Sequence, residues 1–171
     1  MYTKLMRNIL LFVGLVFLQL MIFDNLKLDS FIHPYVYVLF VMLLPFDTPR
    51  WKLILNGFVI GIVIDIFNGT PGLNAAATVM MADLRPVIID MTTRKSDIDG
   101  KNEPSVSEMG LKWFMPYLVL MLIVHNFTLF LIEAFNLRLI GLVLLGTLLS
   151  VIYSTIAIVL IIYIFKPIKK K

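Results

Sequence analysis

The sequence predicts an all-α membrane protein, built as a bundle of six transmembrane helices. Of its 171 residues, 60% are hydrophobic and 15% are charged, whereas a typical soluble domain is about half apolar and about a quarter charged. Mean hydropathy is +0.93. The apolar residues extend over the whole chain, so a single anchor does not account for them. The basic residues also gather on the side of the membrane where six crossings place both termini.

A spanning helix needs about 20 mostly apolar residues. The candidate spans run over 8–23, 31–44, 53–67, 72–91, 113–132 and 137–165. The second and third are short, and a re-entrant segment in place of the second span is an alternative. The fourth is interrupted by Asp83, Arg85 and Pro86, and the proline is expected to break the helix. The sixth is long enough to tilt or to bend near Gly141 and Gly146.

The distribution of basic residues orients these spans. On the six-span scheme, twelve of the 15 basic residues lie on the side of the termini, Lys27 and Arg138 lie opposite, and Arg85 lies within a span. Cytoplasmic loops carry the excess of lysine and arginine, so both termini are predicted to be cytoplasmic. The net charge of +4 then reflects topology and a lysine-rich tail at anionic headgroups, and no nucleic-acid partner is expected.

The chain is predicted to be a single transmembrane domain over 1–171, with one long hydrophilic stretch at 92–112. This stretch mixes both signs of charge and is predicted to be a cytoplasmic loop, with room for a short interfacial helix between Pro104 and Trp113. The first span shows no cleavage site after it and is expected to be retained. The absence of cysteine excludes disulfides and thiolate metal sites, and no cofactor or metal is expected.

The most informative residues lie in the third span. Gly57, Gly61 and Asp65 are spaced at i, i+4 and i+8, which places them on one face of a helix. Glycines at this spacing let a second helix approach closely within a membrane. A carboxylate on the same face costs a few kcal/mol in hydrocarbon. We therefore expect Asp65 to join a buried network that fixes helix packing, the alternative being a side chain that reaches the outer interface.

A tight turn follows this face. Gly69, Pro71 and Gly72 are turn-forming residues, and small side chains begin the next span at Ala75. Together they predict a close-packed hairpin of the third and fourth spans, whose outer end is fixed by the turn and by Asp65.

Other polar residues within the spans have two interpretations each. Arg85 is either buried or at an interface where the fourth span ends at Ala82. His125 is expected to be a hydrogen-bonded packing residue, because His33 is the only other histidine and cysteine is absent, which argues against a zinc site. Glu133 lies at the outer end of the fifth span, and Arg138 is a hypothetical partner for Glu133 or Asp65. Catalytic motifs are absent, so no catalytic residue is assigned.

The pattern Gly57-Phe58-x-x-Gly61-x-x-x-Asp65-x-x-x-Gly69-x-x-Gly72 resembles the signature of the MreD family, small integral membrane proteins of the bacterial rod-shape machinery. The basic N-terminus, Gln19 in an early span, Pro45 after the second span and the basic tail also fit that family. The resemblance covers the whole chain in topology, and residues 45–85 in sequence detail.

This resemblance implies a non-enzymatic scaffold in the inner membrane that supports side-wall peptidoglycan synthesis and cell elongation. It implies an MreC-like protein as the direct partner, with MreB, RodA and a penicillin-binding transpeptidase in the same complex. It also implies a fold similar to the six-helix S subunits of energy-coupling-factor vitamin transporters.

An S subunit is therefore the alternative function. It is disfavoured because the chain has no alanine before Ala75, whereas S subunits carry an alanine stripe on their first helix. An intramembrane enzyme that uses Asp65 and Glu133 is a third and weaker alternative.

Overall fold

All regular structure in the described part of the chain is helical. The computed structural model describes residues 2–25, 33–93, 98 and 100–165. By length and composition, four of its helices are able to cross a membrane: Met6–Phe23, Arg50–Asn68, Leu111–Ala134 and Ile140–Phe165. The predictions of an all-α chain and of transmembrane helices are thus confirmed.

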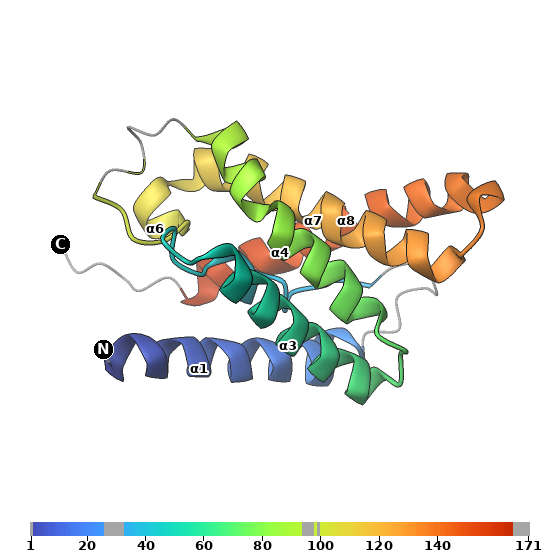
Figure 1. Ribbon diagram of the computed structural model, residues 1–171, viewed down its shortest axis with the longest axis horizontal. Coiled ribbons are helices and arrows are strands. Elements are labelled where there is room, and N and C mark those ends of the chain that lie inside the picture. Colours follow the sequence, from blue (N-terminus) through green and yellow to red (C-terminus); the bar gives the residue numbers. More distant parts are fainter. Residues whose placement is uncertain (1, 26–32, 94–97, 99, 166–171) are drawn as a thin grey trace.

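The helices run back and forth between two ends of the molecule (Figure 1). They are α1 (Tyr2–Leu18), which continues as a π-helical turn (Gln19–Phe23), α3 (Arg50–Asn68), α4 (Leu73–Thr92), α7 (Leu111–Ala134) and α8 (Ile140–Phe165). α4 packs against α3 on one side and α7 on the other, and α7 packs against α8. The start of α1 and the end of α8 lie at one end of the molecule, and the turn from α3 to α4 lies at the opposite end.

The second predicted span is not a spanning helix, so that prediction is wrong. Within residues 33–44 the only helix is α2 (Leu39–Met42), which has four residues. We call residues 33–44 the central segment, because its residues Val36 to Met42 are at most 5% exposed. Helical structure is normally compulsory in lipid because each backbone polar group needs a partner. Here side chains of the surrounding helices supply several of those partners.

The central segment contacts helices on several sides. The ring of Phe40 lies 5.3 Å from that of Phe12 in α1. The ring of Tyr37 lies 5.6 Å from that of His125 in α7. The backbone N–H of Tyr35 donates to Ser154 Oγ in α8 at 2.8 Å. The segment therefore forms the middle of the bundle, enclosed by helices from both halves of the sequence.

α4 runs unbroken through Pro86 to Thr92. The expected break at Pro86 is therefore wrong, and α4 continues past Ala82 as a helix. A proline removes one helical hydrogen bond, and packing against neighbouring helices sustains the rest of such a helix. Because α4 also carries Asp83, Arg85 and Asp90, it is less apolar than the four candidate spans.

The stretch 92–112 is tied to the end of the bundle where α1 begins. A short helix, α6 (Val106–Met109), follows Pro104, and α7 begins at Leu111. Arg7 in α1 forms an ion pair with Glu103 at 2.6 Å. The backbone N–H of Glu103 donates to Glu108 at 3.0 Å, and this bond helps to hold the pKa of the Glu108 carboxyl below its usual value. Residues 94–97 and 99 lie outside the described residues.

Candidate functional site

The contact between α3 and α4 depends on the two glycines of the third predicted span. A Cβ atom at Gly57 would lie 3.0 Å from the carbonyl oxygen of Thr78. At Gly61 it would lie 2.7 Å from the backbone nitrogen of Ala75 and 2.8 Å from the carbonyl oxygen of Asn74. The obstacle at Gly61 is backbone, which cannot swing away as a flexible side chain can. Only glycine fits at Gly61 without moving α4.

The turn between these helices uses glycine where the backbone requires it. Gly69 ends α3 with φ at +67°, and Gly72 precedes α4 with φ at +82°. Side chains with a Cβ rarely adopt this left-handed region. Pro71 lies between the two glycines and is exposed. Gly69, Pro71 and Gly72 therefore reverse the chain within a few residues and bring the start of α4 back to the end of α3.

Asp65 is buried, with 2% of its surface exposed, and its carboxylate binds the start of α4. Oδ1 accepts hydrogen bonds from the backbone N–H and the side-chain amide of Asn74, both at 3.0 Å, and from the hydroxyl of Thr70. Oδ2 accepts the backbone N–H of Ala75 at 2.9 Å. Free N–H groups and the positive end of the helix dipole stabilise a negative charge at this position.

A hydrogen-bond chain leads from this carboxylate to His125. The amide NH₂ of Asn74 donates to Asp65, so its oxygen is the acceptor and receives the hydroxyl of Tyr37 at 3.0 Å. The same hydroxyl lies 2.8 Å from His125 Nε2. Because the phenol has one proton, which it gives to Asn74, Nε2 must be the donor in this arrangement. Nδ1 is buried and has no partner among the described residues.

Gln19 binds the backbone of the central segment. Its Nε2 donates to the carbonyl oxygen of Pro34 at 3.1 Å and to Asp24 Oδ1 at 2.6 Å. Its Oε1 accepts the backbone N–H of Val36 at 2.8 Å. Gln19 is 1% exposed and lies in the π-helical turn that follows α1. It therefore supplies the hydrogen bonds that a non-helical segment cannot make for itself.

Arg85 binds backbone carbonyl groups at the other end of the central segment. It is 1% exposed, so it is buried and not interfacial. Its Nη2 donates to the carbonyl oxygens of Leu44 and Met42, and its Nε donates to the hydroxyl of Tyr117 at 3.1 Å. That hydroxyl in turn donates to the carbonyl oxygen of Met42 at 3.0 Å. A cation suits these carbonyls because Met42 is the last residue of the short helix α2 and Leu44 lies two residues beyond it.

Two predicted polar residues do not join the interior. Glu133 and Arg138 are exposed, near the turn between α7 and α8. The ion pairs among the described residues are Arg7 with Glu103 and Arg50 with Asp83, so the hypothetical pairing of Arg138 with Glu133 or Asp65 is not formed. The physical reason is that Asp65 already has amide and hydroxyl donors, while an exposed pair gains little from contact.

The predicted polar network thus divides into separate parts. His125 belongs with Asp65, through Asn74 and Tyr37. Arg85 belongs to a second cluster with Tyr117. Among the residues that sequence reasoning missed, Asn74 and Thr78 recur at helical spacing with Arg85 on α4, and Tyr117 recurs with His125 on α7. This spacing within apolar runs is the signal that could have found them.

The interior has the chemistry of a structural network. The carboxylate of Asp65, the guanidinium of Arg85 and the amide of Gln19 are engaged with backbone groups. Asn126 Oδ1, like His125 Nδ1, is buried without a partner among the described residues. Within the part of the chain that the structure describes, no three histidine, aspartate or glutamate side chains come together as a metal site would require. No family model, curated protein or solved structure matches this chain.

Proposed function

We propose that this chain is a non-enzymatic scaffold of the bacterial inner membrane that crosses the bilayer six times, with both termini cytoplasmic. In this proposal α4 and the central segment make the two crossings that hydropathy alone does not identify. Irregular backbone is tolerated at membrane depth where protein encloses it, as helices enclose residues 33–44. The excess of lysine and arginine on the side of the termini supports the orientation.

The observation that carries the proposal is the use of the buried polar side chains. Asp65 binds backbone N–H groups of α4, Gln19 binds both kinds of backbone group in the central segment, and Arg85 binds carbonyl oxygens of α2 and of Leu44. A catalytic carboxylate or base must be free to meet a substrate. Groups that are bound in this way instead hold helices in fixed positions, as a scaffold requires.

The proposed role in the rod-shape machinery rests on the residues of the α3–α4 hairpin. Residues 57–72 carry the pattern that resembles MreD, and the same residues form the close contact of α3 with α4 and the tight turn. We therefore propose that the bundle binds the membrane helix of an MreC-like protein, within a complex that includes MreB, RodA and a penicillin-binding transpeptidase. The exposed apolar side chains of α8, such as Leu145, Leu148 and Ile152, offer a surface for such a helix.

The six-crossing bundle would share its topology with the S subunits of energy-coupling-factor transporters. An S subunit also needs space among its helices for a vitamin. Here Val36, Tyr37, Val38, Val41 and Met42 have no exposed surface, and their segment occupies the middle of the bundle. This filled interior favours the scaffold over the transporter subunit.

The test is purification of the tagged chain from its native membranes in mild detergent, with mass spectrometry of the proteins that accompany it. An MreC-like protein with cell-wall synthases is the expected result. The variant Gly61→Leu should lose these partners because α4 must move. Gly14→Leu should keep them, because a Cβ at Gly14 meets nothing within 4 Å and Gly14 lies on α1, outside the proposed partner surface. Recovery of ATPase subunits with a coupling membrane protein would instead identify a transporter subunit.

A further inference from the structure

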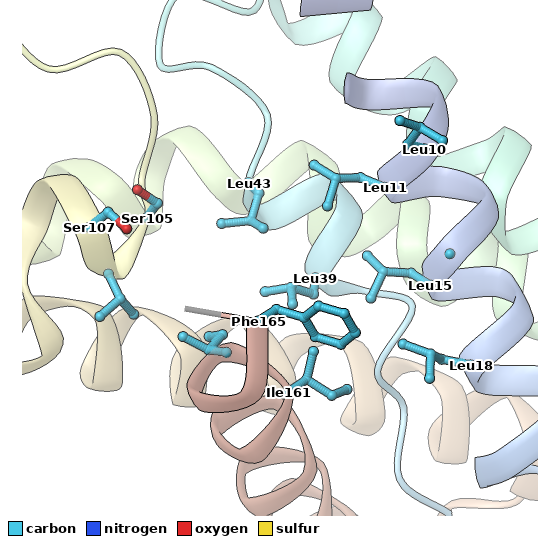
Figure 2. Close-up of a pocket in the computed structure, with 13 residues that line it drawn as sticks. Leu10, Leu11, Leu15, Leu18, Leu39, Leu43, Ser105, Ser107, Ile161 and Phe165 are labelled. Carbon is cyan, nitrogen blue, oxygen red and sulfur yellow. The ribbon is translucent and has the colours of Figure 1, made fainter. Parts of the chain in front are cut away.

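An apolar groove separates α1 from α8 (Figure 2). Its volume is about 300 Å³. Side chains of α1 form one wall, side chains of α8 form the opposite wall, and α2 with Leu43 forms the floor. The walls and floor include Leu11, Leu15, Leu18, Leu39, Ile161 and Phe165. The groove is open to the surroundings, since Leu10, which lines it, is 68% exposed.

One end of this groove is polar. Ser105 and Ser107, which flank the start of α6, place their hydroxyls at the end shown on the left in Figure 2. Ser105 Oγ is buried and has no hydrogen-bond partner in the described part of the chain. Arg7 lies about one helical turn before Leu10 and Leu11, at the same end, where it pairs with Glu103. A ligand of this groove should therefore be a long apolar chain with a polar group at one end.

We propose that the groove binds one acyl chain of a bilayer phospholipid, with the polar end of the lipid beside the exposed Ser107. The lining fits this class of ligand, since pockets for small molecules are mostly apolar and carry few polar groups. The volume fits as well. If a methylene needs roughly the 30 Å³ that a water occupies in the liquid, 300 Å³ holds on the order of ten methylenes.

The same volume argues against a transmembrane helix as the occupant. Such a helix is about 10–12 Å across with its side chains and about 30 Å long. Several hundred cubic ångströms accommodate only a small part of it. The lipid site is therefore distinct from the partner surface proposed above, and either proposal stands without the other.

Two glycines give a matched pair of variants for the test. A Cβ at Gly14 or at Gly141 meets nothing within 4 Å, so a larger side chain should leave the fold intact at either position. Gly14 lines the groove, and Gly141 lies on the exposed face of α8. Gly14→Phe fills the groove, whereas Gly141→Phe adds the same side chain elsewhere. Thermal unfolding in detergent checks that both variants fold.

Native mass spectrometry of the delipidated protein, titrated with a palmitoyl-oleoyl phospholipid, measures the binding. We expect one saturable lipid on the unaltered chain and on Gly141→Phe, and at least tenfold weaker binding to Gly14→Phe. Non-saturable binding to the unaltered chain, or equal binding to the two phenylalanine variants, would overturn the proposal.

The chain has no cysteine, so Gly14→Cys carries a single thiol for a photoactivated crosslinker. After purification in detergent, this variant should crosslink to a phospholipid, while Gly141→Cys should not. Crosslinking of residue 14 to another protein, or to a second copy of this chain, would contradict the lipid assignment.

Discussion

Asp65 binds the first turn of a helix to which it does not belong, with its Oδ2 lying 2.9 Å from the backbone nitrogen of Ala75. The residue that precedes α4 is Gly72, which has no side chain to cap the helix. Asp65 supplies the missing acceptors from near the end of α3. The close approach at Gly61 is what brings the carboxylate within reach. The same close contact therefore determines both how α3 packs on α4 and how the start of α4 is capped.

Asp65→Asn should destabilise the protein although the side chains have nearly the same shape. An amide has one acceptor oxygen, so its NH₂ group must face either the N–H of Ala75 or the donors of Asn74 and Thr70. A buried donor left without a partner costs about 1–3 kcal/mol. Thermal unfolding in detergent measures this loss. Asp83→Asn is the control, because Asp83 forms an exposed ion pair and its loss should shift unfolding little. Equal shifts in both variants would refute the capping argument.

Gly61→Ala tests the close approach with a single methyl group. The added Cβ would lie 2.7 Å from the backbone nitrogen of Ala75, so the helices must separate, and overpacking of this kind costs about 1–3 kcal/mol. Gly57→Ala, at 3.0 Å from the carbonyl oxygen of Thr78, should cost less. Gly141→Ala should be neutral or stabilising, because alanine favours a helix by about 0.5–1 kcal/mol over glycine. A different order of unfolding temperatures would exclude this account of the hairpin.

The hairpin was predictable from sequence because its determinants are local. Gly57, Gly61 and Asp65 mark one face, and the turn residues follow at once. Asp65 and its partner Ala75 are separated by 10 residues, and helical spacing shows both positions. The capping role of Asp65 was not predictable. The sequence alone does not show that α4 begins directly after Gly72 and therefore lacks a side-chain cap of its own.

The central segment was not predictable in this way, because its backbone partners are distant in sequence. Tyr35 and Ser154 are 119 residues apart, and Arg85 and Leu44 are 41 apart. An apolar stretch that is buried on all sides has the same composition whether it is helical or not. For the same reason, the sequence alone left two interpretations of Arg85, buried or interfacial. The structure shows that it is buried and donates to the carbonyl oxygens of Met42 and Leu44.

Arg85→Lys should be destabilising although it keeps the charge. The guanidinium reaches the carbonyl oxygens of Met42 and Leu44 and the hydroxyl of Tyr117 from different nitrogens, whereas an ammonium is a single point on a flexible stem. At least one buried acceptor should lose its donor, which costs about 1–3 kcal/mol. Thermal unfolding gives the comparison with Arg50→Lys, where the arginine is exposed and only a small shift is expected. A smaller effect at Arg85 than at Arg50 would contradict its structural role.

Gln19→Leu removes the support of the central segment while keeping an apolar side chain of similar size in the first span. The backbone N–H of Val36 and the carbonyl oxygen of Pro34 both lose their partner. Each buried group left unsatisfied costs about 1–3 kcal/mol, so the effect should exceed that of any single-bond variant above.

Hydrogen exchange at the Val36 amide gives a local readout of this change. Protection of that amide should fall in Gln19→Leu by more than the general loss of stability explains, because its own acceptor is gone. Asn25→Leu is the matched control, since Asn25 is exposed and, among the described residues, donates to the carbonyl oxygens of Leu20 and Met21. If protection at Val36 were unchanged in Gln19→Leu, the central segment would hold its conformation through apolar packing alone, and Gln19 would not be its anchor.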